Sequence, residues 1–272
     1  MKKYDVIIIG MGCAGIGAFL QMKKTMKSIL AIEEKRIGGA VFYANRITNM
    51  PLIKSIDGRR IVELFEKQIK KDAKIIYEKC VSIEENKDSV NVTTEKNKFL
   101  SRYTIICTGR EPKEMKNVKL KMKTIGDKLK GKNICIIGGG EMAVDYSISL
   151  SERGKSVEII STGNFLKVNK NLTNEAKIKR IKFNRMCIVN NVIKDKDYYV
   201  KFIKNNKTIV KRFSDVILCI GTKKLLPEIK GEKRKKRILF AGTVKNSISK
   251  QCSIAFADGV REAMKISEKN TE

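Results

Sequence analysis

The chain has 272 residues, of which 42% are apolar, so it can form one large domain or two modest ones and is too apolar to be disordered throughout. It contains no histidine, which excludes histidine-based catalysis and histidine metal sites. Its seven cysteines include no Cys-x-x-Cys pair, so we expect no zinc ribbon, iron–sulfur run, local redox dithiol or other metal site.

The net charge of +29 has explanations that the sequence leaves open. Lysine and arginine number 58 and aspartate and glutamate 29. A biased genome composition would give this excess without any function, whereas a functional excess would attract an acidic protein or nucleic acid. Aromatic residues are only 6% and do not interleave with the basic runs, so nucleic acid is the least favoured partner. No stretch has the length of a signal peptide or membrane span, and we expect a cytoplasmic, reducing compartment with free thiols.

The first half of the chain predicts a strand–turn–helix–strand unit followed by shorter elements. In chain order we expect a buried strand at 6–9, a glycine-rich turn at 10–15, a helix through about residue 26, a strand at 29–32, a helix at 58–73 and short strands from 75 to 106. The continuous apolar run at 6–9 is typical of a strand that is buried on both faces.

The second half repeats this pattern. We expect a buried strand at 133–137, a glycine-rich turn at 138–143, a helix to about 153, a strand at 157–160, an antiparallel meander at 186–213, strands at 216–221 and 238–242, and a closing helix at 250–268. The duplication predicts an α/β fold with two Rossmann-like, three-layer dinucleotide-binding domains.

The first turn carries a complete dinucleotide fingerprint, Gly-x-Gly-x-x-Gly. Gly10 permits the tight turn, Gly12 lets the backbone approach a pyrophosphate, and Gly15 lets the helix pack close to the strand. Glu33, at the end of the next strand, is placed to accept hydrogen bonds from a ribose. Strand, glycines, helix and acid together make this motif specific.

The second turn is less complete. Gly138, Gly140 and Ala143 stand in the same strand–turn–helix context. The following strand, however, ends in Ser161-Thr162-Gly163, which offers neither a carboxylate for a ribose nor arginines for a 2′-phosphate. Binding of NAD(P) at this turn is therefore left open.

Together these motifs resemble the low-molecular-weight thioredoxin reductase family. The resemblance rests on the two glycine-rich turns and on Gly38-Gly39, Asn49-Met50-Pro51, Cys107-Thr108-Gly109-Arg110, Ala241-Gly242-Thr243 and Lys250-Gln251-Cys252. It implies an FAD-binding domain at 1–112 and 232–272, an inserted NAD(P)-binding-like domain at 113–231, and a homodimer. It also implies a set of FAD-binding residues: Gly10, Gly12, Gly15, Glu33, Gly38, Gly39, Asn49, Thr108, Gly109, Gly242, Thr243, Gln251 and Cys252.

Three departures from the family pattern bear on function. Where the family has its redox Cys-x-x-Cys, just before an aspartate matched by Asp127, this chain has Lys123-Thr124-Ile125-Gly126. Ser161-Thr162-Gly163 replaces the His-Arg-Arg that binds the NADPH 2′-phosphate, so NADPH selectivity is doubtful. Thr243 replaces an aspartate, which predicts weaker FAD binding. Thiol–disulfide exchange needs a sulfur pair, so reduction of thioredoxin is not expected.

These features predict an FAD-dependent oxidoreductase whose flavin exchanges electrons directly with a partner, with or without NAD(P)H. The chain is similar also to thioredoxin-reductase-like ferredoxin–NADP reductases, and the charge suits an acidic ferredoxin or flavodoxin. The basic run at 233–237 and Lys223-Lys224 are the candidate docking surface, the alternative being a solvated loop. The alternative function is a non-catalytic flavin- or nucleotide-binding protein, such as a sensor or assembly partner.

No catalytic acid or base can be named. Cys13 and Cys252 are candidate redox thiols because the resemblance projects both close to the flavin. The favoured interpretation of each, however, is a small residue that fills a tight turn or helix start. Cys107, Cys135 and Cys219 lie in apolar strand runs and are predicted to be core residues.

Overall fold

The computed structural model describes residues 2–50, 52–69, 71–115, 118, 123–163, 168–231, 236–245 and 251–269. The chain divides into two compact units, residues 1–110 with 224–272 and residues 111–223. The second boundary therefore differs from the predicted one at 231/232. The reason is that β16 (Glu228–Gly231) pairs in parallel with β4 (Cys80–Glu85) and so joins the sheet of the first unit.

The first unit is built on a parallel sheet in the strand order β3-β2-β1-β6-β17. Its strands are β1 (Lys3–Ile9), β2 (Ile29–Glu33), β3 (Ile75–Tyr77), β6 (Lys98–Ile106) and β17 (Ile238–Phe240). The apolar run of β1 is buried on both faces, as its sequence predicts. Val6 and Ile8 belong to the core on the helical side, and Ile7 and Ile9 to the core on the other side.

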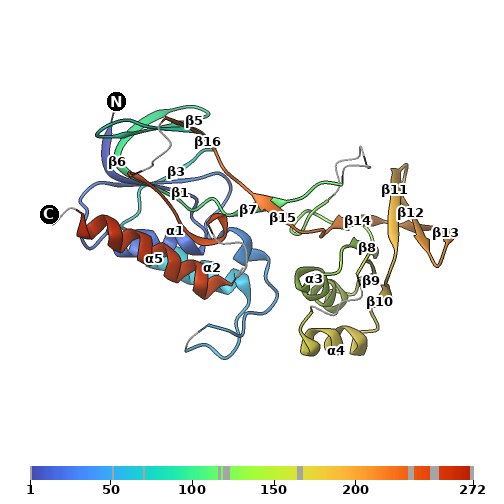
Figure 1. Ribbon diagram of the computed structural model, residues 1–272. Coiled ribbons are helices and arrows are strands. Elements are labelled where there is room, and N and C mark those ends of the chain that lie inside the picture. The colour runs from blue at the N-terminus through green and yellow to red at the C-terminus, as the bar shows by residue number, and fades with distance from the viewer. Residues whose placement is uncertain are drawn as a thin grey trace. The chain divides into compact units, whose positions relative to one another are not determined.

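Three helices cover one face of this sheet, namely α1 (Cys13–Met22), α2 (Gly58–Ile69) and α5 (Cys252–Glu268) (Figure 1). Two short 3-10 helices, η1 (Gly39–Tyr43) and η2 (Gly242–Val244), connect to them. On the other face β4 and β5 (Val90–Thr94) form antiparallel strands that continue from β6. Helix α1 ends at Met22 and not near residue 26, because residues 23–25 leave the helix in tight turns.

The second unit repeats the three layers. Its parallel sheet has the order β10-β9-β8-β14, built from β8 (Asn133–Ile137), β9 (Ser156–Ile160), β10 (Lys182–Asn184) and β14 (Asp215–Leu218). Helices α3 (Glu141–Glu152) and α4 (Lys170–Ile178) pack on one face. The predicted meander is confirmed on the other face as β11 (Ile188–Lys194), β12 (Tyr198–Lys204) and β13 (Lys207–Phe213).

Two short strands, β7 (Arg110–Pro112) and β15 (Thr222–Lys224), form a two-stranded sheet where the chain passes between the units. Across the described ranges, no helix combines the length and apolar character needed to cross a bilayer.

Candidate functional site

The turn between β1 and α1 requires glycine at two positions. Gly10 has a φ of +92°, and a Cβ added to it would lie 2.6 Å from the carbonyl oxygen of Cys107. A Cβ on Gly15 would lie 1.9 Å from the carbonyl oxygen of Gly10. Glycine at these two positions therefore allows the tight turn and the close approach of α1 to β1, as predicted.

Gly12 differs from both, because the protein's own packing does not require it. Its φ of −72° suits any residue, and the nearest atom to an added Cβ is the Gly38 carbonyl oxygen at 4.0 Å. Helix α1 begins at the next residue, and no side chain caps its N-terminus. The open space and the free N–H groups of the first helical turn fit an anionic pyrophosphate. The residues present at this turn therefore fit a bound dinucleotide.

Glu33 lies at the end of β2 and is only 9% exposed. Its Oε2 accepts a hydrogen bond from the Met11 N–H at 2.7 Å. Its Oε1 accepts from the N–H groups of Lys35 and Arg36 at 2.9 and 3.2 Å. A carboxylate has about four lone-pair positions, so one remains for a ribose hydroxyl. Glu33 thus also holds the glycine-rich turn against β2.

Gly38 and Gly39 lie directly beside the first turn. Gly38 forms a parallel β-bridge with Gly12, and its N–H donates to the Met11 carbonyl at 2.8 Å. A Cβ on Gly39 would lie 3.4 Å from the Gly12 Cα. Asn49 is exposed, and its carbonyl accepts a hydrogen bond from the Ser253 hydroxyl at 3.4 Å, which places it next to the start of α5.

The Thr108-Gly109 and Gly242-Thr243 segments also meet. The Thr108 hydroxyl donates to the carbonyl of Leu225, and a Cβ on Gly109 would lie 3.5 Å from the Thr243 Oγ1. A Cβ on Gly242 would lie 2.7 Å from the Ala14 Cβ, so this segment packs against the start of α1. Residues far apart in the sequence are thus brought together around one helix N-terminus.

Two buried acids of α5 were missed by the sequence reasoning. Asp258 and Glu262 are 6% and 4% exposed, and Asp258 Oδ2 accepts the Gly242 N–H at 2.8 Å. Burial raises the pKa of Glu262, but the Lys245 and Lys265 ammonium groups outweigh it and hold this pKa below its usual value. The two acids are four residues apart, which places them on one face of α5. This spacing is the sequence pattern that could have indicated them. These acids fix the Gly242 turn.

Gln251 and Cys252 begin α5. Gln251 is the exposed N-cap residue and Cys252 is the first helical residue, 9% exposed. Its sulfur lies 2.8 Å from the sulfur of Cys13, the first residue of α1. The two candidate redox thiols are therefore in direct contact, 239 residues apart in the sequence.

The second glycine-rich turn has the same backbone design. Gly138 has a φ of +135°, and an added Cβ would lie 2.1 Å from the Cys219 carbonyl oxygen. Gly140 is the N-cap of α3 with a φ of −88°, and no atom lies within 4 Å of an added Cβ. Ala143 is fully buried in α3. The turn has room for a nucleotide backbone, although Glu141 places a negative charge in the first helical turn.

The three residues that follow β9, residues 161–163, carry no cationic side chain. Ser161 is 5% exposed, and its Oγ accepts the N–H of Gly163 at 3.1 Å. The serine hydroxyl therefore stabilises the turn at residues 161–163. Thr162 and Gly163 are exposed. A 2′-phosphate would find no guanidinium or ammonium group among these three residues.

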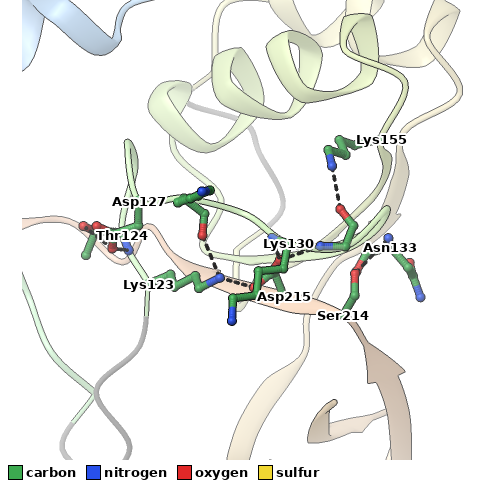
Figure 2. Close-up of polar contacts among 10 residues, drawn as sticks. Lys123, Thr124, Asp127, Lys130, Asn133, Lys155, Ser214 and Asp215 are labelled. Atoms are coloured by element: carbon green, nitrogen blue, oxygen red, sulfur yellow. Dashed lines mark hydrogen bonds and ion pairs between the residues drawn. The ribbon is translucent and has the colours of Figure 1, made fainter. Parts of the chain in front are cut away.

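The segment matched to the family's redox pair is a turn held by polar contacts, shown in Figure 2. The Asp127 carboxylate accepts the N–H of Thr124 at 2.7 Å. The Lys123 ammonium group donates to Asp215 of β14 and, at 2.8 Å, to the Lys128 carbonyl. Asp215 is 2% exposed, and its Oδ2 accepts the N–H groups of Lys130 and Gly131 at 2.7 and 3.1 Å. Lys123 thus has a structural role here.

Some of the candidate docking residues are among the residues that the structure describes. Lys233, Arg234 and Lys235 lie outside the described residues, whereas Lys236 is exposed. Lys223 and Lys224 are both exposed in β15, and Lys223 pairs with Glu111 at 3.2 Å.

Comparison with known proteins assigns this fold and turn geometry to a family. A family model described as pyridine nucleotide-disulphide oxidoreductase matches residues 4–237. The chain therefore belongs to this family, which implies binding of FAD and a nicotinamide nucleotide. The predicted α/β fold with two dinucleotide-binding domains is confirmed.

Among individual proteins the chain is similar to thioredoxin reductases. That of Ureaplasma parvum is 28% identical over 171 residues, covering 58% of this chain and 55% of that protein, so the match spans about half of that relative. That of Mycoplasma genitalium is 22% identical over 302 aligned positions, covering 97% of this chain and 94% of that protein. The solved structure of the T. acidophilum enzyme has a TM-score of 0.88 and 22% identity over the whole of both chains.

Proposed function

We propose that the chain is an FAD-dependent oxidoreductase whose flavin exchanges electrons directly with a protein partner, such as ferredoxin or flavodoxin. Family membership supports the flavin, and the absence of a Cys-x-x-Cys from the sequence argues against the usual disulfide relay. FAD, when bound, supplies the electron-transfer chemistry. The residues of the first unit bind and orient it.

The observation that carries this proposal is the open space at Gly12 beside the uncapped start of α1. Gly10 and Gly15 are required by packing, whereas Gly12 is not, so an external group explains its identity best. Glu33 keeps one lone-pair position for the ribose, and Gly242 and Thr243 lie against the same helix end.

The test compares Gly12→Val with Gly140→Val. Both glycines have negative φ values and open space at Cβ, so neither change should strain the backbone. Wild type and Gly140→Val should show flavin absorbance after incubation with FAD, and Gly12→Val should stay colourless. The proposal is wrong if wild type does not bind FAD, or if Gly12→Val binds it as well as wild type does.

The segment around Lys123 supports direct transfer without an active-site disulfide. Lys123 is bound to the buried Asp215 and Asp127 closes the turn, so the segment is stabilised by polar contacts. Thioredoxin reduction is accordingly not part of the proposal. A coupled assay that showed turnover of thioredoxin would contradict this part alone.

A non-catalytic flavin- or nucleotide-binding protein is the competing outcome. Anaerobic addition of NADH, NADPH and reduced ferredoxin to the FAD-loaded chain separates the two. Bleaching of the flavin absorbance by any of them supports the oxidoreductase. A flavin that stays oxidised with all three supports the non-catalytic protein. The homodimer implied by the resemblance stays a prediction.

A further inference from the structure

The contact between Cys13 and Cys252 joins two nucleophilic side chains that the proposed function does not use. Their sulfur atoms are 2.8 Å apart, and the residues are 6% and 9% exposed. Each is the first residue of a helix, Cys13 of α1 and Cys252 of α5. Nothing in the spacing of the sequence brings them together. Their contact follows from the packing of α1 against α5.

The packing of these helices is tight and depends on glycine. A Cβ on Gly17 would lie 2.3 Å from the Phe256 carbonyl oxygen, and one on Gly259 would lie 1.9 Å from the Ala14 carbonyl oxygen. The two helix starts are therefore held at a fixed separation, and the sulfur atoms meet without any side-chain rearrangement. Two thiols at this distance need little movement to form a covalent bond.

We propose that Cys13 and Cys252 are a redox-active pair that closes reversibly into a disulfide, with a low-molecular-weight disulfide as the oxidant. The bond joins the starts of α1 and α5 next to Gly12 and Gln251. The pair gives the chain an internal two-electron store at a place unrelated to residues 123–126. It does not depend on bound flavin.

The surroundings of the two sulfurs favour one thiolate. Both sulfurs lie at helix N-termini, where the helix dipole stabilises negative charge. The hydrogen bond from Cys13 lowers the pKa of Cys252, and the same bond, together with burial, raises the pKa of Cys13. Of the seven cysteines, all within the described ranges, only Cys252 has a lowered pKa. Burial raises those of Cys80 and Cys219 to about 12.

The reaction balances as two successive exchanges. The Cys252 thiolate attacks one sulfur of the small disulfide and releases the first small thiolate, which takes up a proton. Cys13 then loses its proton and attacks the Cys252 sulfur, which releases the second small thiolate. The two cysteines lose two electrons and two protons, and the small disulfide becomes two thiols. A small dithiol reverses the sequence.

The test counts thiols in the full, flavin-free chain. The reduced protein is incubated with hydroxyethyl disulfide, unfolded in acid, and labelled with an alkylating reagent for intact-mass and peptide analysis. Wild type should lose two of its seven labels, carry no adduct, and yield one cross-linked pair of peptides containing Cys13 and Cys252. Dithiothreitol should restore all seven labels.

Single cysteine-to-serine variants identify which two cysteines form the disulfide. Cys252→Ser and Cys13→Ser should lose the cross-link, whereas Cys80→Ser, at a half-buried position away from it, should keep it. Oxidation should raise the urea midpoint of wild type and Cys80→Ser, but not of Cys252→Ser, because the bond closes a long loop. Retention of all seven labels in wild type, or a cross-link between other cysteines, overturns the proposal without any need for a folded variant. Neither result depends on FAD, so failure here leaves the proposed function untouched.

Discussion

At the scale of single residues, Lys123 stabilises the segment that the resemblance matches to the family's redox pair. It lies where the resemblance sets the first redox cysteine, and its ammonium group pairs with Asp215, which is 2% exposed. Two backbone N–H groups complete the surroundings of this carboxylate. Burial works to raise the pKa of Asp215, but Lys123 and the N–H groups of Gly131 and Lys130 outweigh it, so the pKa is lowered.

Removing the charge of Lys123 should therefore destabilise the fold. Loss of one partner of a buried pair costs about 3–5 kcal/mol, and because two N–H donors remain on Asp215 we expect about 2–3 kcal/mol for Lys123→Met. Lys128→Met, at an exposed neighbour, should change the free energy of unfolding by less than about 0.5 kcal/mol. Urea denaturation at neutral pH measures both. Equal stability of the two variants would show that the pair contributes nothing.

The same pair predicts a pH dependence with a definite sign. The folded pKa of Asp215 is below its unfolded value of about 3.9, so its contribution is complete above that value and is lost as pH falls through the folded pKa. The stability difference between wild type and Lys123→Met should therefore shrink below about pH 4. A difference that grew on acidification would mean that Asp215 is not the partner concerned.

Ser161 sets the expected nucleotide selectivity. Its hydroxyl is engaged with the Gly163 N–H, and neither Thr162 nor Gly163 can neutralise a 2′-phosphate. A charge-assisted hydrogen bond contributes about 1.5–3 kcal/mol, which is about tenfold or more in affinity. We expect the dissociation constants of NADPH and NADH to differ by less than about tenfold in an anaerobic titration. A hundredfold preference for NADPH would reveal a cationic site outside these residues.

At the scale of elements, the packing of α1 against α5 determines the site. Gly259 lies in the middle of α5, where Ala would ordinarily favour the helix by about 1 kcal/mol. Here an added Cβ would lie 1.9 Å from the Ala14 carbonyl oxygen, so the clash reverses the sign. We expect Gly259→Ala to lose about 3 kcal/mol of stability and to weaken FAD binding. Gly163→Ala, whose nearest atom is 3.8 Å away, should be close to neutral in urea unfolding.

The sequence predicted the elements whose pattern is local. The apolar run of β1, the fingerprint turns and the meander can each be identified from a hydrophobic pattern or a glycine spacing within a short stretch of sequence. Strand β16 was missed, and the domain boundary with it, because only Ile229 of its four residues is apolar and its pairing with β4 is long-range. The Cys13–Cys252 contact and the hydrogen bond from Gly242 to Asp258 were not predicted for the same reason, since each joins residues that are distant in the sequence. Packing of distant helix ends leaves no local sequence pattern.

At the scale of the whole molecule, the net charge of +29 is the property that the fold does not explain. A flavin that passes electrons directly to a protein needs that protein to dock close by, and opposite charge speeds such encounters. Lys224 and Lys236 are exposed members of the candidate docking surface in the first unit. Composition bias, in contrast, predicts that the position of a positive charge does not matter.

Salt and charge reversal distinguish these explanations. The Debye length falls from about 30 Å at 0.01 M salt to about 10 Å at 0.1 M, so steered electron transfer should slow steeply over this range. We expect reduced ferredoxin or flavodoxin to bleach the flavin, and Lys224→Glu with Lys236→Glu to slow this without loss of FAD. Lys170→Glu with Lys196→Glu makes the same change in net charge at exposed positions of the second unit, and it should have a smaller effect. Equal slowing by both pairs would assign the effect to net charge alone. No transfer from either carrier at low salt would leave composition bias as the explanation of the charge. If NADH and NADPH also left the flavin oxidised, the non-catalytic protein would be favoured.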